Sequence, residues 1–371
     1  MTDPRIDRLG ELIVGYSLGL REGETLRIDV PVVAAPLALA LQRAALRLGA
    51  RPILSARLPE LEELLLREGS AEQLAFVSPI AIREFDTVAA AVTVWADTNT
   101  RSRSRVDPAR ERARAVALGR AGQRLRDRIA RGEARWCGVL FPTQAHAQDA
   151  ALPLDEYTDF VLGACHVDEP DPAAHWRSVS AGLAARARQL EGVRELRILA
   201  PDTDLTLSVA GRTWLAADGR QNMPDGEVYT SPVETSATGT VRFTFPALVA
   251  GHEIEDVRLR LAGGRVVVAE ARAGRDFLRS LLATDDGAAV LGEVAFGLNP
   301  EIDRFTRHVG LDEKIGGTLH LALGRGFPAA GGSNVSAVHT DLVLDLRSGG
   351  EVLADGEPLF RDGRFLEEAD A

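Results

Sequence analysis

Apolar and polar positions follow two alternating patterns over the first half of the chain. Segments with apolar side chains every three or four positions predict helices, as in residues 5–18 and 107–132. Residues 23–30, which leave a glycine turn, are predicted to form a strand, and the apolar segment of residues 85–97 is predicted to form a buried one. The two kinds of segment succeed one another at the spacing of βα units, which is typical of a mostly parallel sheet covered on both faces. The fold class predicted for residues 1–193 is therefore a Rossmann-like α/β domain.

The pattern changes near residue 194, where short apolar segments and glycine-rich turns replace the helices. The pair Gly263-Gly264 is typical of a hairpin turn between two such segments. One helical segment, residues 275–291, interrupts the strands. We therefore predict a second, β-rich α+β domain over residues 194–371.

Composition and charge exclude several classes of function. The chain has 45% hydrophobic and 26% charged residues, and it contains no apolar run of about 18 residues that would span a membrane. The net charge of −11 disfavours a nucleic-acid partner, and the basic run 101–105 is expected to be a solvated loop. No glycine-rich phosphate fingerprint follows a strand. The N-terminus has no signal-peptide pattern. Cys137 and Cys165 lie in apolar contexts without C-x-x-C spacing, so we expect them to be buried free thiols of a cytoplasmic protein.

Three candidate metal-binding residues lie close together near the C-terminal end of the sequence. His339 and Asp341 stand two positions apart in an apolar context, so on a strand both side chains would point to the same face. His320 lies in a second apolar run that ends at a glycine-rich turn, and a hairpin could bring it beside the other two. A metal site is one interpretation, and histidines satisfied within a core are the other.

Two further acids stand out because of their surroundings. Glu293 interrupts an apolar run, and a buried carboxylate without a partner costs several kcal/mol, which a metal ion would offset. Glu227 lies in a turn rich in Pro and Gly that leads into a short strand. The alternatives are an edge-strand acid that faces water for Glu293 and an ordinary turn acid for Glu227.

Together these residues form a set of three carboxylates and two imidazoles. Such donors suit Zn, Co or Mn, and two divalent ions would balance the charge of the acids and a hydroxide. Paired ions of this kind serve hydrolysis. The remaining histidines of the first domain, namely His146, His166 and His175, show no partner spacing, so surface or capping roles are expected for them.

Four segments between residues 214 and 346 resemble the signatures of the aminopeptidase T / aminopeptidase S family of metallo-aminopeptidases. They read NMPDGEVYTSP, LGEVAFGLNP, EKIGGTLHLALGRGFP and HTDLVLDL. The resemblance implies two divalent metal ions per chain. It implies as their ligands Glu227, Glu293, His320, His339 and Asp341. It also implies that Glu313, seven residues before His320, moves protons, and that the protein is a homodimer acting on short peptides.

One position departs from the family pattern. The family usually has a tyrosine where this chain has Phe327, and phenylalanine has no hydroxyl to donate. Either another donor replaces it or the activity is altered. Tyr229 is the nearest tyrosine within a motif, and the sequence does not show whether it reaches the site.

Three hypotheses follow from the sequence. The first is an aminopeptidase that removes N-terminal residues from short peptides with a water activated by two metals. The second is a mononuclear enzyme on the same scaffold, either an Fe(II) ring-cleaving dioxygenase using His320, His339 and Asp341 or a hydrolase of aromatic amides or amines. The third is a non-catalytic relative, which only the Phe327 substitution supports.

Overall fold

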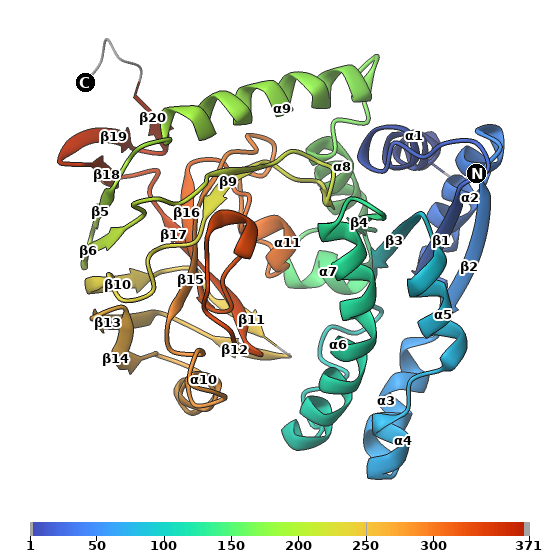
Figure 1. Cartoon of the computed structure of the whole chain (residues 1–371), viewed down its shortest axis with the longest axis horizontal. Helices are drawn as coiled ribbons and strands as arrows, with labels where there is room; N and C mark the ends of the chain where they lie inside the picture. The colour runs from blue at the N-terminus through green and yellow to red at the C-terminus, as the bar shows by residue number, and fades with distance from the viewer. Residues whose placement is uncertain (1–2, 250, 367–371) are drawn as a thin grey trace. The chain divides into compact units, whose positions relative to one another are not determined.

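The computed structural model describes residues 3–249 and 251–366 (Figure 1). The chain forms two compact units that interleave once along the sequence. The first consists of Met1–Trp176 and Gly219–Pro224, and the second of Arg177–Asp218 and Asp225–Ala371. The domain boundary predicted between residues 193 and 194 falls just after a helix that crosses from one unit to the other, α9, and it stays a prediction.

The first unit is built on a five-stranded sheet in the order β2-β1-β3-β4-β8, and all neighbouring strands are parallel. Its strands are β1 (Thr25–Pro31), β2 (Arg51–Arg57), β3 (Ala90–Trp95), β4 (Arg135–Leu140) and β8 (Asn222–Met223). The α-helices along this part of the chain are α1 (Pro4–Leu12), α2 (Ala35–Arg47), α3 (Pro59–Glu68), α4 (Ala71–Ala75), α5 (Pro79–Thr87), α6 (Pro108–Ala130), α7 (Gln144–Asp149), α8 (Leu154–Ala164) and α9 (Pro172–Gln189). The predicted α/β class with a mostly parallel sheet is confirmed.

Two predicted elements of this unit differ from the structure. Residues 85–97 were expected to be one strand, but Phe85 to Thr87 close helix α5, and the strand begins only at Ala90. The Ser78 side chain caps that helix and Pro79 occupies its first turn, a start signal that the apolar pattern hides. The N-terminal helix continues past α1 as a π-helix, Ile13–Ser17.

The expectation of a surface or capping role is wrong for His146, which is buried, whereas the other two histidines are partly exposed but contact one another. His146 is 3% exposed, and its Nε2 lies 3.2 Å from Asp97 Oδ2. His166 and His175 lie against one another, with ring centroids 3.9 Å apart. The first contact joins residues 49 positions apart, and the second depends on the connection between α8 and α9, so sequence spacing reports neither.

The second unit is β-rich, as predicted, and contains three sheets. An eight-stranded sheet has the order β14-β13-β10-β6-β5-β18-β19-β20, a five-stranded sheet the order β17-β16-β15-β9-β7, and β11 pairs with β12. The strands are β5 (Glu195–Ala200), β6 (Thr203–Ser208), β7 (Leu215–Ala217), β9 (Glu227–Thr230), β10 (Thr238–Phe243), β11 (Ala247–Val249), β12 (His252–Ile254), β13 (Val257–Ala262), β14 (Arg265–Glu270), β15 (Leu291–Gly297), β16 (Thr318–Gly324), β17 (His339–Asp345), β18 (Glu351–Ala354), β19 (Glu357–Arg361) and β20 (Arg364–Phe365). The helix expected over residues 275–291 ends early, as α10 (Arg275–Leu282), and a short helix α11 spans Val309–Asp312.

The five-stranded sheet has one apolar face and one polar face. Its leucines and aromatic side chains enter the hydrophobic core of the second unit: Val228, Val294, Phe296, Leu319, Leu321, Leu323, Leu342 and Leu344. The residues between them in sequence point to the opposite face because successive side chains alternate along a strand. Burial of one face therefore fixes which residues the other face presents. In the part of the chain that the structure describes, no helix combines the length and the apolar character needed to cross a membrane.

The predicted glycine turn joins β13 and β14 and packs against a neighbouring loop. Gly264 has φ of +79°, and its amide donates to the carbonyl of Ala237 over 2.9 Å. A β-carbon at Gly264 would lie 1.8 Å from the carbonyl oxygen of Glu234, whereas one at Gly263, with φ of +57°, would meet nothing within 4 Å. The two glycines share a left-handed conformation and differ in the space around them.

We therefore expect Gly264→Ala to lower the free energy of unfolding by about 2 kcal/mol or more beyond Gly263→Ala. The control carries only the backbone cost, about 1–2 kcal/mol, of placing an L-residue in the left-handed region. Urea denaturation followed by circular dichroism measures both changes. Equal losses for the two variants would contradict the packing argument.

Candidate metal centre

The polar face of the five-stranded sheet carries the residues singled out in the sequence. Glu293 on β15 lies opposite Ala322 on β16, which lies opposite Asp341 on β17. In the next row, Tyr229 on β9, Ala295 and His320 follow one another across the same strands. Directly opposed residues share a face, so the acids and the imidazole project together. The small alanines between them leave open space between the charged groups.

Glu293 occupies the middle of this arrangement. It is 4% exposed on a strand that pairs on both sides, so the alternative of an edge-strand acid facing water is wrong. Its Oε1 lies 3.7 Å from the Nε2 of His320, and its Oε2 lies 3.3 Å from the Nε2 of His339.

The other two acids approach the same imidazoles. Glu227 Oε2 lies 3.7 Å from His320 Nε2, and Asp341 Oδ1 lies 4.0 Å from it. Asp341 Oδ1 is also 3.6 Å from the Nε2 of His339. All five residues predicted as ligands therefore meet on one face, contributed by four neighbouring strands.

Each imidazole is oriented by a backbone carbonyl on its far side. His320 Nδ1 lies 3.0 Å from the carbonyl oxygen of Glu313, and His339 Nδ1 lies 2.9 Å from that of Arg325. A carbonyl oxygen only accepts, so each Nδ1 carries a proton and donates it. Both Nε2 atoms consequently face the carboxylates. Histidines that bind a metal commonly donate one ring N–H to a carbonyl in this way and offer the other nitrogen to the ion.

The donor set fits divalent cations. Two groups of three possible ligands have their donor atoms within 4.8 Å of one another, one made by Glu293, His339 and Asp341 and the other by Glu313, His320 and Asp341. The two groups share Asp341. Glu227 Oε2 and Asp341 Oδ1 are buried and have no hydrogen-bond partner among the described residues. A buried carboxylate oxygen without a partner is costly, and a cation would satisfy both.

Burial and mutual charge shift the pKa values of these groups strongly. Burial raises the pKa of Glu227 to about 8, against the opposing effect of the Lys314 ammonium. Burial acts in the same direction on Glu293, but hydrogen bonds from the two imidazoles outweigh it and lower its pKa to about 2. Burial would lower the pKa of His320, yet the carboxylates, Glu293 foremost, raise it to about 10. Protonated imidazoles thus supply the positive charge that bound cations would otherwise supply to the acids.

The sequence reasoning missed two members of this site, Lys314 and Asp225. The Lys314 side chain is fully buried, and its Nζ lies 3.6 Å from Asp225 Oδ1 and 3.5 Å from Glu227 Oε1. It also donates to Glu313 Oε1. Lys314 is the only lysine among the 43 basic residues of the chain. That usage was a visible signal, since lysine supplies a compact point charge where the arginine fork would not fit.

Phe327 lies directly against the centre. Its ring contacts that of His339 edge to face, with centroids 5.2 Å apart, and that of Tyr229, with centroids 5.1 Å apart. Tyr229 stands two residues after Glu227 on β9 and shares its face of the strand. A phenol therefore adjoins the position at which the chain carries a phenylalanine.

Lys314→Met in the chelated protein should lower the free energy of unfolding by about 3–5 kcal/mol, because three buried carboxylates lose the cation that compensates them. Arg361→Met removes a cation that is half exposed and paired with Glu351, and should cost about 1 kcal/mol or less. Urea denaturation in the presence of a chelator compares the two. A Lys314 variant no less stable than the Arg361 variant would rule out this electrostatic role.

Comparison with known proteins places this geometry in a family. Aminopeptidase 2 of Geobacillus stearothermophilus is 28% identical over 99% of this chain and 98% of its own length. Aminopeptidase T of Thermus thermophilus is 27% identical over 97% of this chain and 98% of its own. The solved structure of wild-type AmpT from Thermus thermophilus superimposes with a TM-score of 0.83 over 98% of this chain and 99% of that one, at 25% identity.

The family model described as thermophilic metalloprotease (M29) matches residues 2–365. The resemblance inferred from the four motifs is thus confirmed, as is the prediction of a metal-dependent hydrolase acting on peptide bonds. The chain belongs to the thermophilic metalloprotease family, M29.

Proposed function

We propose that this protein is an aminopeptidase that holds two divalent metal ions on the polar face of the five-stranded sheet and removes N-terminal residues from short peptides. The observation that carries the proposal is the pair of ligand groups sharing Asp341. A shared carboxylate is the element that can bridge two ions. The names of the relatives, aminopeptidases 2 and T, support the reaction.

Charge supports two ions rather than one. Five carboxylates lie within 4.0 Å of the Lys314 ammonium or of an imidazole nitrogen: Asp225, Glu227, Glu293, Glu313 and Asp341. Together with that ammonium they amount to a formal charge of minus four when the imidazoles are neutral. Two divalent cations neutralise this charge, whereas a single ion leaves the buried site strongly anionic.

The proposed ligands are the five residues expected from the sequence, namely Glu227, Glu293, His320, His339 and Asp341. Carboxylate and imidazole donors suit Zn, Co or Mn. Bound ions of this kind lower the pKa of a water molecule and polarise the carbonyl group of the substrate. Glu227 lies outside the two groups that share Asp341, and its place among the ligands rests on its unpartnered Oε2 and on the 3.7 Å approach to His320.

Glu313 is our candidate for proton transfer. Its carboxylate accepts from Lys314, and its carbonyl holds the ring of His320, so both ends of the residue are fixed beside the centre. In this position it would accept a proton from the attacking water and deliver it to the leaving amine. Its presence in one of the ligand groups marks it as an alternative ligand.

We assign to the Tyr229 hydroxyl the donor role that Phe327 cannot fill. The two rings are in contact, and burial together with the nearby Glu227 and Glu293 carboxylates raises the pKa of the phenol, so the hydroxyl keeps its proton. A protonated phenol beside the reacting carbonyl can stabilise the negative charge that develops there.

A cavity of about 210 Å³ opens beside His339 and Asp341. Most of its wall is apolar, with Leu248, Val249, Phe305, Val309 and Val343 contributing side chains. Apolar walls favour an apolar side chain of the substrate. We therefore expect the enzyme to prefer peptides with an apolar residue next to the scissile bond.

Two further proposals concern the oligomeric state and the cellular compartment. The family resemblance suggests a homodimer, which size-exclusion chromatography with light scattering measures. Both cysteines are buried and free, which fits the reducing cytoplasm.

The mononuclear alternative is not favoured, because three acids join the two histidines and Asp341, and the family is one of metalloproteases.

The central test of the function uses Glu293→Ala. We expect the wild type to bind about two ions per chain and to release leucine from short peptides. Chelation should abolish the release, and added Zn, Co or Mn should restore it. The variant should lose bound metal and at least about 10²-fold in kcat, because both imidazoles lose the carboxylate between them. Elemental analysis and a leucine-amide assay measure these effects.

Glu270→Ala is the matched control, since this acid is exposed on β14. It should keep both the metal and the activity. Full metal content and no turnover on any peptide would contradict the aminopeptidase proposal, and an active Glu293 variant would contradict the site.

Tyr229→Phe should lower kcat by about 10²–10³ and leave the metal content unchanged, because one hydrogen-bond donor to the developing charge is removed. Phe327→Tyr, introduced into that variant, should recover part of the loss, since it places a phenol against His339. Steady-state kinetics measure both. Wild-type turnover in Tyr229→Phe would show that this hydroxyl takes no part.

A further inference from the structure

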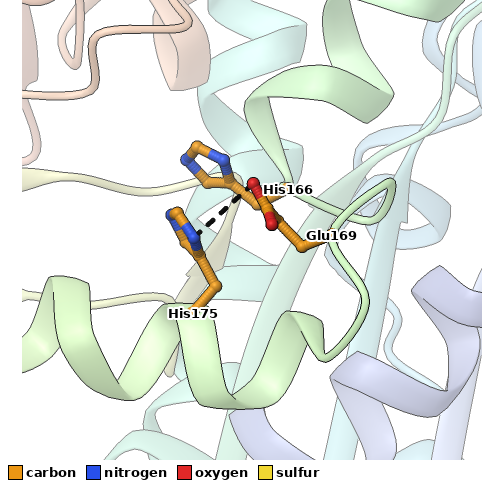
Figure 2. A group of neighbouring side chains, drawn as sticks. All are labelled: His166, Glu169 and His175. Carbon is orange, nitrogen blue, oxygen red and sulfur yellow. Dashed lines mark ion pairs between the residues drawn. The ribbon is translucent and has the colours of Figure 1, made fainter.

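A second group of possible metal ligands lies in the first unit, whereas the residues of the candidate metal centre belong to the second. It consists of His166, Glu169 and His175 (Figure 2). His166 follows the end of α8, Glu169 lies in the loop after it, and His175 stands in the first turn of α9. Figure 2 shows the two imidazoles face to face, with the carboxylate directed toward them.

The donor atoms of this group are close together. The rings of His166 and His175 are stacked with centroids 3.9 Å apart and planes 29° apart. Glu169 Oε1 lies 3.9 Å from His175 Nδ1, and one donor atom from each residue lies within 4.8 Å of the others. All three side chains are partly exposed, so an ion could reach them from solvent.

Buried contacts hold the framework behind the three side chains. Trp176 is fully buried and meets the His166 ring edge to face, with centroids 5.8 Å apart. The Trp176 indole donates to the carbonyl of Cys165 over 2.8 Å, and the Tyr16 hydroxyl donates to the Trp176 carbonyl over 3.1 Å. Arg8 donates to the carbonyl of Glu169. Both helix ends that carry the group are therefore anchored, whereas the donor atoms remain accessible.

His166 has a left-handed backbone conformation just after the end of α8. The residue has φ of +54° in the position immediately after the C-cap of α8, where glycine is usual. The equivalent position after α2 is a glycine, Gly49, with φ of +73°. An L-residue in this conformation costs about 1–2 kcal/mol. The left-handed turn at His166 sets the direction in which the chain leaves α8 toward α9.

We propose that His166, Glu169 and His175 bind a divalent transition-metal ion, with Zn²⁺ as the ion of choice, and that the ion fastens the end of α8 to the start of α9. Two imidazoles and one carboxylate are a recognised Zn²⁺ donor set, with water in the fourth position. Tetrahedral ligands at about 2.0–2.1 Å from zinc lie about 3.3 Å apart. The donor atoms now lie within 4.8 Å of one another, so they must close by up to about 1.5 Å. Rotation of partly exposed rings supplies that movement.

Two surrounding features favour a cation here. Burial and the neighbouring His175 lower the pKa of His166 to about 4, so this imidazole is neutral and has a lone pair to donate. The segment around Glu169 is acidic, with the sequence DEPD over residues 168–171, and this negative charge favours a bound cation. The proposal is independent of the function assigned to the metal centre.

The experiment compares the full-length wild type with His166→Asn/His175→Gln after dialysis against Zn²⁺. Asparagine tolerates the left-handed conformation, and glutamine suits a helix, so the variant should fold. Elemental analysis should find one ion fewer per chain in the variant, with peptide hydrolysis unchanged. His252→Gln is the control because its ring is also stacked, on Phe277 with centroids 4.3 Å apart, and it belongs to no ligand group among the described residues.

A second arm separates this site from the metal centre. In the Glu293→Ala background, Zn²⁺ should still raise the melting temperature, and this rise should vanish when His175→Gln is added. An anomalous peak at the zinc edge between the three side chains would locate the ion. Equal metal content in the wild type and the double variant, or no peak there, would overturn the proposal and leave an ordinary ring stack. Either result would stand whatever the outcome at the metal centre.

Discussion

The structure of the second unit depends on balancing charge that has been removed from water. Five carboxylates gather around one ammonium and two imidazoles, and most of these groups are almost fully buried. Desolvated acids cannot remain together without cations, and the Lys314 ammonium compensates only one of them. The opposite pKa shifts of Glu227 and Glu293 express the same imbalance. The divalent ions that we propose would remove this imbalance, so metal binding and the stability of this sheet would depend on the same balance of charge.

The sheet can hold these charges because its other face is so strongly apolar. Leucines at alternate positions of β16 and β17 enter the core and fix the strand register. A shift of one residue would turn the acids into the apolar core and the leucines onto the face that gathers the charged groups. Alanines at 295 and 322 then leave space between the proposed ligands and keep their places in the paired strands. Packing of the apolar face therefore fixes the positions of the charged side chains on the opposite face.

Much of this site could be predicted from the sequence because strand periodicity is local. The spacing of His339 and Asp341 gives a shared face directly, and an acid within the apolar run around Glu293 indicates compensated burial. The fold class followed from the same alternation of segments. Asp225 and Lys314 escaped notice because nothing local marks an ion pair that joins residues 89 positions apart. Only the solitary use of lysine in an arginine-rich chain pointed to it.

The two histidine groups of the chain show where such reasoning reaches its limit. At the proposed metal centre the pairing of the strands determines which side chains meet, so two-residue spacing in the sequence predicts that they share a face. At His166 and His175 the meeting depends on how two helices are joined and on a left-handed residue between them. No period describes that geometry, and the apparent lack of partner spacing was therefore no evidence against a partner. Irregular connections between helices are where ligand groups in this fold must be sought from structure, since their backbone, not their sequence spacing, brings the donors together.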